Sequence, residues 1–184
     1  ILMKFTKLEI PDVILIEPYV YNDDRGYFTE TYKQNELDEF LGRSINFCQE
    51  NETKSSYGVL RGLHYQLNPH AQTKLVRVTQ GAVLDVVVDL RKDSPNFAKH
   101  LSVELSEYNK RQLLIPDGFA HGFVVLKDNT KFLYRVDNYY NLESERGIAF
   151  NDPELGIDWK LNQNDLKLSK KDSNLPLFNN AEYF

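Results

Sequence analysis

The chain has 184 residues, 41% of them hydrophobic, and a formal net charge of -5. This composition is that of an ordinary globular protein and argues against a disordered or fibrous one. The acidic balance argues against a nucleic-acid partner. The sequence contains no apolar run near the ~18 residues of a membrane helix and no signal-peptide pattern at its start. We therefore expect one domain over residues 1–184, located in the cytoplasm without a membrane partner.

Short apolar or alternating runs predict β-strands along most of the chain. In chain order these runs are 13–21, 82–90, 101–105, 122–126 and 131–136. Turn-forming residues separate them, and a strand recurs about every ten residues through the middle of the chain, a spacing typical of a sandwich or barrel. The pattern predicts a mainly β fold of the jelly-roll type.

Residues 33–41 predict an early helix, because their apolar side chains recur at i, i+3 and i+4 and Gly42 follows as a stop. The polar segment from about 160 to 184 predicts a further short helix near residues 164–168. The predicted fold is therefore mainly β with a few short helices.

Cys48 is the single cysteine, which excludes an internal disulfide and fits a reducing compartment. It stands in an apolar stretch, so we expect a buried and unreactive thiol. His64 is followed by Tyr65 and Gln66 instead of the second histidine of a His-x-His pair. The ligands for zinc or iron are too few, so we expect no catalytic metal.

Two of the four histidines, His64 and His121, lie where a predicted strand meets a glycine-rich turn. Strand alternation predicts that His64 shares a face with Gly62 and Gln66, and that Arg61 points to the opposite face. A single histidine in such a position is more often structural than catalytic, so neither residue decides the function by itself.

Cationic and tyrosine side chains supply further candidates. An arginine fork matches phosphate geometry, and a pocket tyrosine can donate a proton. Taken singly, however, a surface ion pair or a tyrosine that fills the core is the more common explanation. The candidates are Arg25, Arg61, Lys74, Arg77, Lys170, Lys171 and Tyr134.

Read together, several segments closely resemble the dTDP-4-dehydrorhamnose 3,5-epimerase family, in the same order and over nearly the whole chain. The matching segments are DDRGYFTE (23–30), GVLRGLHYQ (58–66), KLVRVTQGAVLDVVVDLR (74–91), IPDGFAHGF (115–123), FLYR (132–135), YY (139–140), NDPELGIDW (151–159) and LSKKD (168–172). Each segment alone is a weak signal, whereas their ordered set is highly specific.

The resemblance implies a metal-free cupin jelly-roll β-barrel that needs no cofactor and works as a homodimer. It also implies that the segment bearing Arg25 crosses to the partner subunit. The implied reaction inverts C3 and C5 of dTDP-4-dehydro-6-deoxy-D-glucose to give dTDP-4-dehydro-L-rhamnose, a step toward dTDP-L-rhamnose for surface polysaccharide. Both carbons flank the C4 ketone, so an enolate can form on either side.

The resemblance further implies roles for individual residues. His64 is the expected base, Asp172 its orienting partner, Tyr134 the acid on the opposite face, and Lys74 the group that stabilises the enolate oxygen. The residues implied in substrate binding are Arg25, Phe28, Glu30, Gln49, Asn51, Arg61, Asp85, His121, Tyr140, Glu145 and Lys171. Among them, Tyr140 is expected to stack on thymine, and Asp85 to act from behind the site.

Other functions remain open from the sequence. A single-site 3- or 5-epimerase of a related nucleotide deoxysugar would use the same residues in a pocket of different shape. A sugar 3,4-ketoisomerase shares the architecture but matches the segments less well. A non-catalytic cupin binding module would explain the barrel, but not why His64, Asp172, Tyr134 and Lys74 occur together.

Overall fold

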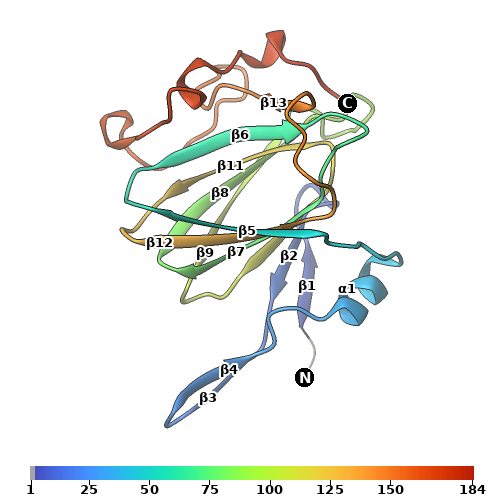
Figure 1. Ribbon diagram of the computed structural model, residues 1–184, viewed down its shortest axis with the longest axis vertical. Coiled ribbons are helices and arrows are strands. Elements are labelled where there is room, and N and C mark those ends of the chain that lie inside the picture. Colours follow the sequence, from blue (N-terminus) through green and yellow to red (C-terminus); the bar gives the residue numbers. More distant parts are fainter. Residues whose placement is uncertain (1–2) are drawn as a thin grey trace.

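The computed structural model describes residues 3–184 and consists of two antiparallel sheets stacked face to face (Figure 1). One sheet has the order β1 (Lys4–Lys7), β2 (Ile14–Glu17), β10 (Gln112–Ile115), β7 (Lys74–Gln80), β12 (Thr130–Val136) and β5 (Gln49–Ser55). The other has the order β13 (Glu145–Gly147), β6 (Leu60–Gln66), β11 (Phe119–Val125), β8 (Ala82–Asp89) and β9 (His100–Ser106). The protein is mainly β, a cupin-type jelly roll with a few short helices, as the sequence predicted.

Apolar side chains from both sheets pack against one another between the two sheets. Val76, Val87, Leu113, Phe123 and Phe132 are buried in this cluster. They alternate along their strands with residues that face outward, as the pleat of a strand requires. Strand β8 is buried along its whole length because a second apolar layer covers its outer face. This explains why its sequence reads as a continuous apolar run.

Helix α1 (Gln34–Leu41) confirms the helix predicted over 33–41. It ends at Gly42, which adopts a φ of 67° and donates its N–H to the carbonyl of Asp38 at 2.8 Å. This left-handed conformation suits glycine because it has no Cβ. Leu37 packs into an apolar cluster on the outer face of the six-stranded sheet, so the helix covers part of that face.

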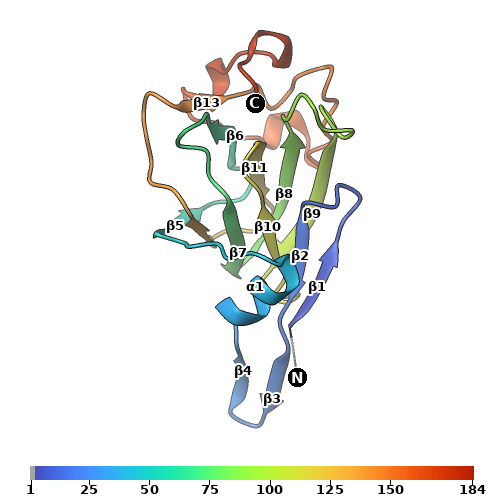
Figure 2. The ribbon, with the colours of Figure 1, turned by 90° about the vertical axis from the view of Figure 1, so that its right-hand side faces the viewer.

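The predicted strand over 13–21 is in fact two strands. Strand β2 ends at Glu17, and β3 (Val20–Asp23) pairs only with β4 (Gly26–Thr29) in a separate hairpin. Pro18 lies between them and has no N–H for the sheet ladder, which explains the break. The hairpin projects away from the two sheets (Figure 2).

The C-terminal segment crosses the outer face of the five-stranded sheet. It contains three 3-10 turns, η1 (Gln163–Asp165), η2 (Asp172–Asn174) and η3 (Phe178–Asn180). The helix predicted near 164–168 is therefore only a single turn that ends earlier. Buried Asp152 holds this segment by accepting a hydrogen bond from the Phe178 N–H at 2.7 Å.

The prediction of a buried thiol is wrong, because Cys48 is exposed. It stands directly before β5, which lies at the edge of its sheet and has a neighbouring strand on one side only. No helix within residues 3–184 combines the length and the apolar character needed to cross a membrane.

Candidate active site

A cavity of about 580 Å³ lies between the two sheets, beside the apolar cluster that contains Phe123 and Phe132. Strands β5, β7 and β12 form one wall, and β6 and β11 form the other, with residues 167–172 closing one side. Most of the residues singled out from the sequence line it, namely His64, Lys74, Tyr134, Asp172, Gln49, Asn51, Arg61, His121, Tyr140, Glu145 and Lys171. The fold therefore brings together residues that are spread over more than half of the chain.

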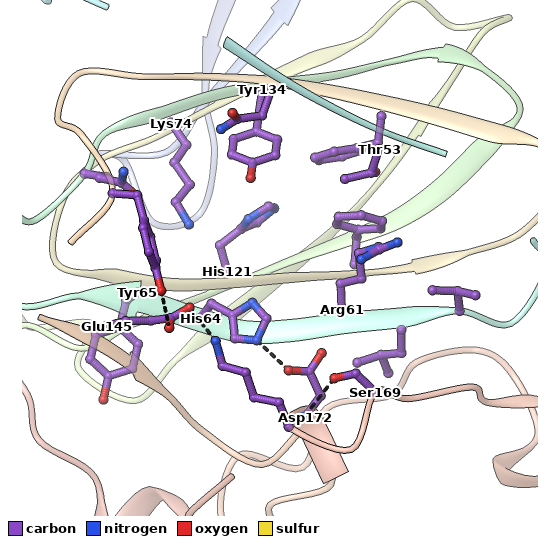
Figure 3. A pocket seen from close by; sticks show the side chains of 18 of the residues that line it. Thr53, Arg61, His64, Tyr65, Lys74, His121, Tyr134, Glu145, Ser169 and Asp172 are labelled. Atoms are coloured by element: carbon purple, nitrogen blue, oxygen red, sulfur yellow. Dashed lines mark hydrogen bonds and ion pairs between the residues drawn. The ribbon is translucent and has the colours of Figure 1, made fainter. Parts of the chain in front are cut away.

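His64 and Asp172 form a hydrogen-bonded pair, with 2.6 Å between His64 Nε2 and Asp172 Oδ1 (Figure 3). Asp172 is 5% exposed, and its second oxygen accepts the Gly62 N–H at 3.2 Å. Burial alone would raise the pKa of Asp172, but the contacts with His64, the Gly62 N–H and Lys171 together outweigh burial and lower it. The carboxylate therefore stays ionised and holds the imidazole ring, leaving Nδ1 free of partners within residues 3–184.

Arg61 and His64 lie on the same face of β6, contrary to the prediction from simple alternation. The pairing with β11 shifts register between these two residues, so three steps along β6 match two along β11. Such a bulge turns the side chain that follows it to the other face. It needs Gly62, because a Cβ there would lie 2.6 Å from the β11 main chain.

Tyr134 and Lys74 face His64 from the opposite wall (Figure 3). Burial raises the pKa of Tyr134, against a smaller lowering by its hydrogen bond with Asn51. Burial also lowers the pKa of Lys74 to about 8, because desolvation outweighs the attraction of nearby carboxylates. Tyr134 therefore keeps its proton at neutral pH. The pKa of Lys74, in contrast, lies close to neutral pH.

Asp85 lies behind His121 and does not line the cavity. The His121 ring nitrogen Nε2 lies 2.8 Å from Asp85 Oδ2. Asp85 is fully buried, and its other oxygen has no hydrogen-bond partner within residues 3–184. Burial raises the pKa of Asp85 despite the opposing contact with His121. Asp85 is thus placed to hold His121 and reaches the cavity only through it.

At the mouth of the cavity, Glu145 joins Tyr140 and Lys171. The Tyr140 hydroxyl donates to Glu145 Oε2 at 3.0 Å, and Lys171 Nζ lies 2.5 Å from Glu145 Oε1. Burial would raise the pKa of Glu145, but these two contacts outweigh it and lower the pKa. Tyr140 is 57% exposed, so much of this residue is accessible to a planar ligand.

Besides Asp85, five residues singled out from the sequence do not line the cavity of their own chain, namely Arg25, Phe28, Glu30, Arg77 and Lys170. Arg25 and Phe28 lie on the hairpin β3–β4, and Glu30 follows it. Arg25 pairs with Asp23 in the hairpin turn, and Phe28 is 63% exposed. Within one chain, the side chains of Arg25, Phe28 and Glu30 lie outside the lining of this cavity.

The cavity also has polar lining residues that the sequence analysis did not select. They are Thr53, Gln66, Gln72, Lys167 and Ser169. For Gln66 a signal existed, since alternation from His64 already put it on the same face. For Lys167 and Ser169 no local pattern indicates a site, because their position depends on how the C-terminal segment crosses the sheet.

Within residues 3–184 no cluster of three or more His, Cys, Asp or Glu side chains could hold a metal ion. The expectation of no metal and no cofactor stays a prediction.

Fold and cavity together define the class of this protein, a cupin-type jelly roll with titratable groups on both walls of a polar cleft. Residues 7–180 match the family model described as dTDP-4-dehydrorhamnose 3,5-epimerase. The chain belongs to this family, as the resemblance in its sequence indicated.

Individual relatives are similar over their whole length. The dTDP-4-dehydrorhamnose 3,5-epimerase of Shigella flexneri is 52% identical over 182 residues, which cover 99% of both chains. The crystal structure of the enzyme of this name from Elizabethkingia anophelis has a TM-score of 0.93 and 51% identity, covering 96% of this chain and 97% of its own. The structure of dTDP-6-deoxy-D-glucose-3,5-epimerase from Legionella pneumophila, in complex with dTDP-4-keto-L-rhamnose, has a TM-score of 0.92 and 45% identity, covering 97% and 94%.

Proposed function

We propose that this protein inverts C3 and C5 of dTDP-4-dehydro-6-deoxy-D-glucose, giving dTDP-4-dehydro-L-rhamnose for dTDP-L-rhamnose synthesis. One observation carries the proposal. This chain belongs to the epimerase family, and its cavity has the His64–Asp172 pair on one wall and Tyr134 on the other. Inversion at a carbon requires proton removal from one face and proton return to the other. Groups on opposite walls meet that requirement.

His64 acts as the base in this mechanism. Asp172 bonds Nε2 of the ring, so the free Nδ1 takes the proton from C3 or C5. The ionised carboxylate then stabilises the imidazolium that forms. Because the C4 ketone lies between the two carbons, the electrons of either broken C–H bond move onto the same ketone oxygen. A single base therefore serves both centres if the sugar turns between the steps.

Tyr134 returns a proton from the other side of the enolate. Its raised pKa keeps the hydroxyl protonated until it transfers the proton to the enolate carbon. Lys74 projects from the same wall and stabilises the negative charge on the ketone oxygen while its ammonium group is charged. His121 contacts the sugar and is held in place by Asp85.

The nucleotide occupies the mouth of the cavity. The thymine ring stacks on the ring of Tyr140, and Lys171 with Glu145 lies beside it. Arg61 binds the diphosphate, a role supported by its place on the cavity face of β6 without a carboxylate partner among the described residues. Gln49 and Asn51 provide further polar contacts from β5.

The active unit is a homodimer in which each hairpin β3–β4 completes the site of the other subunit. Exposed Tyr21, Tyr27 and Phe28 on the hairpin support this, since an isolated hairpin gains no stability from exposed aromatic rings. Arg25 and Glu30 would then meet the nucleotide of the partner. Mixing inactive Arg25→Ala and His64→Ala proteins tests this arrangement, because a mixed dimer has one site with neither change. Activity that stays absent after subunit exchange contradicts the crossing.

Hydrogen exchange at the sugar tests the reaction itself. The protein is incubated with dTDP-4-dehydro-6-deoxy-D-glucose in deuterated water, and the sugar protons are followed by NMR. Deuterium at both C3 and C5, with a product reducible to dTDP-L-rhamnose, is the expected result. Label at one carbon only would identify a single-site epimerase, and no label would leave a binding module. A cytoplasmic location stays a prediction.

A further inference from the structure

Gln66 is a buried polar residue whose side chain does not belong to the acid–base machinery. It lies on β6 two residues after His64, borders the cavity and is 5% exposed. Its amide forms three hydrogen bonds, all with main-chain groups. Nε2 donates to the carbonyls of His70 at 2.6 Å and Tyr139 at 3.2 Å, and Oε1 accepts the N–H of Asn141 at 2.8 Å.

Two of these bonds lie on either side of Tyr140. One amide accepts from the peptide group after this residue and donates to the one before it, so it fixes the main chain from which the Tyr140 side chain projects. The ring is largely exposed, and its hydroxyl bond to Glu145 is at the far end of the side chain. The direction of the ring therefore depends on the two hydrogen bonds by which the Gln66 amide fixes the main chain on either side of Tyr140.

The same position also connects to Glu145. Strands β13 and β6 pair with Glu145 opposite Gln66 and Gly147 opposite His64. Strand β6 therefore carries the His64 base and, through the side chain and main chain of Gln66, fixes two residues at the mouth of the cavity. A rigid link of this kind sets the distance between the two ends of a bound ligand.

We propose that Gln66 is a positioning residue that sets the thymine-stacking ring of Tyr140 at the correct distance and angle from His64. The inference rests on the proposed function, in which Tyr140 binds the base of a dTDP-sugar. It adds a residue whose amide nitrogen and oxygen are both bonded to the main chain and which acts through Tyr140 and its neighbours. Its loss should therefore weaken nucleotide binding and leave the chemical step nearly intact.

Two substitutions of Gln66 separate hydrogen bonding from shape. Gln66→Met keeps the volume and removes all three bonds, whereas Gln66→Glu keeps the acceptor for Asn141 and sets an oxygen against two carbonyls. For both variants we expect the KM for the dTDP-sugar and the Kd for dTDP to rise about tenfold, the size expected for losing buried hydrogen bonds. The kcat should stay within about threefold of wild type, because His64 and Tyr134 are unchanged.

A matched control removes other hydrogen bonds between the two loops that Gln66 contacts, residues 67–73 and residues 137–144. Asn138 Nδ2 donates to the carbonyls of Pro69 at 3.1 Å and Ala71 at 3.4 Å, and Asn138 does not line the cavity. Asn138→Ala should therefore leave the Kd for dTDP within about twofold of wild type. An equal loss in this control would mean that general loosening of the loops explains the effect, which would overturn the inference.

A double-mutant cycle decides whether Gln66 acts through Tyr140. In a Tyr140→Ala background, Gln66→Met should weaken dTDP binding no further. Additive losses would overturn the inference, as would unchanged KM and Kd in an active Gln66→Met enzyme. Amide hydrogen exchange adds a readout without ligand, since the N–H of Asn141 should exchange faster in Gln66→Met. Wild-type protein that neither exchanges sugar protons nor binds dTDP would instead refute the proposed function and the inference with it.

Discussion

The two walls of the cavity prepare their reactive groups in different ways. On the β6 wall, His64 is held by a hydrogen bond of 2.6 Å to Asp172, whose other oxygen is bonded to the main chain. On the opposite wall, Tyr134 and Lys74 form no ion pair within the described residues, and burial dominates the shifts of their pKa values. The reactive group of the β6 wall is therefore oriented by a hydrogen-bonded partner, whereas the reactive groups of the opposite wall are tuned by burial.

This difference predicts how each wall fails. A group that is held by a hydrogen-bonded partner loses its catalytic contribution abruptly when either residue is changed, because the remaining residue is left without its hydrogen bond. A group tuned by burial responds gradually to pH and to the loss of its charge. Substitutions and pH profiles can therefore test the contrast directly.

The largest effect is expected on the β6 wall. His64→Ala should lower kcat by about three orders of magnitude, the range of a positioned general base. Deuterium incorporation at both C3 and C5 should stop, while dTDP still binds, because the nucleotide contacts lie elsewhere. Asp172→Asn should cause a large part of the same loss, since a neutral amide cannot stabilise the imidazolium. Near-normal turnover by His64→Ala would show that another residue is the base.

A smaller and different effect is expected on the opposite wall. Tyr134→Phe removes the acid without disturbing the base, so kcat should fall about a hundredfold. Exchange of sugar protons with deuterated water should fall less than product formation, because proton removal by His64 continues. NMR measures both rates in one sample. An equal fall in both rates would place Tyr134 in the step of proton removal.

The overall fold could be predicted from local sequence patterns, because its elements depend on neighbouring residues. The runs over 82–90 and 131–136 and the helix over 33–41 all appear close to their predicted bounds. The division of 13–21 into two strands could not, because it depends on which strands pair, although Pro18 marks the position of the break. Cys48 was misplaced for a similar reason, since an edge strand cannot be recognised before the strand order is known.

The site was less accessible to local reasoning. Asp172 is 108 positions away from His64, so only the resemblance to a family linked them before the fold was known. Alternation placed Arg61 on the wrong face, because the bulge beside Gly62 arises from pairing with β11. The importance of Gln66 depends on bonds to residues more than 70 positions away. Such relations come from tertiary packing and leave no periodic pattern in the sequence.

Lys74 gives the contrast a pH dependence. Its ammonium group is charged below a pKa of about 8 and neutral above it, and only the charged form stabilises the enolate oxygen. The kcat/KM should therefore be flat near neutral pH and fall about tenfold per unit at higher pH. Tyr134 cannot cause this limb, because burial raises its pKa.

Lys74→Arg provides the matched variant for the pH profile. A guanidinium stays charged across this range, so the alkaline limb should move to higher pH even if the maximal rate is lower. Lys74→Met should abolish the alkaline limb of the pH profile and lower kcat/KM about a hundredfold. An alkaline limb that is unchanged in both variants would assign the titration to another group.

The smallest effect concerns the support of the β6 wall. Ser169 Oγ accepts the main-chain N–H of Asp172 at 3.0 Å and so helps to hold the start of η2. Ser169→Ala should lower kcat about fivefold, because one hydrogen bond of about 1 kcal/mol that orients the carboxylate is lost. Ser173→Ala is the control, since its hydroxyl donates a hydrogen bond to the Ser169 carbonyl at 2.9 Å and not to Asp172. If both variants lose the same activity, the turn as a whole holds the carboxylate. If only Ser169→Ala loses activity, the position of the His64 base depends on a series of single hydrogen bonds through Asp172 and Ser169.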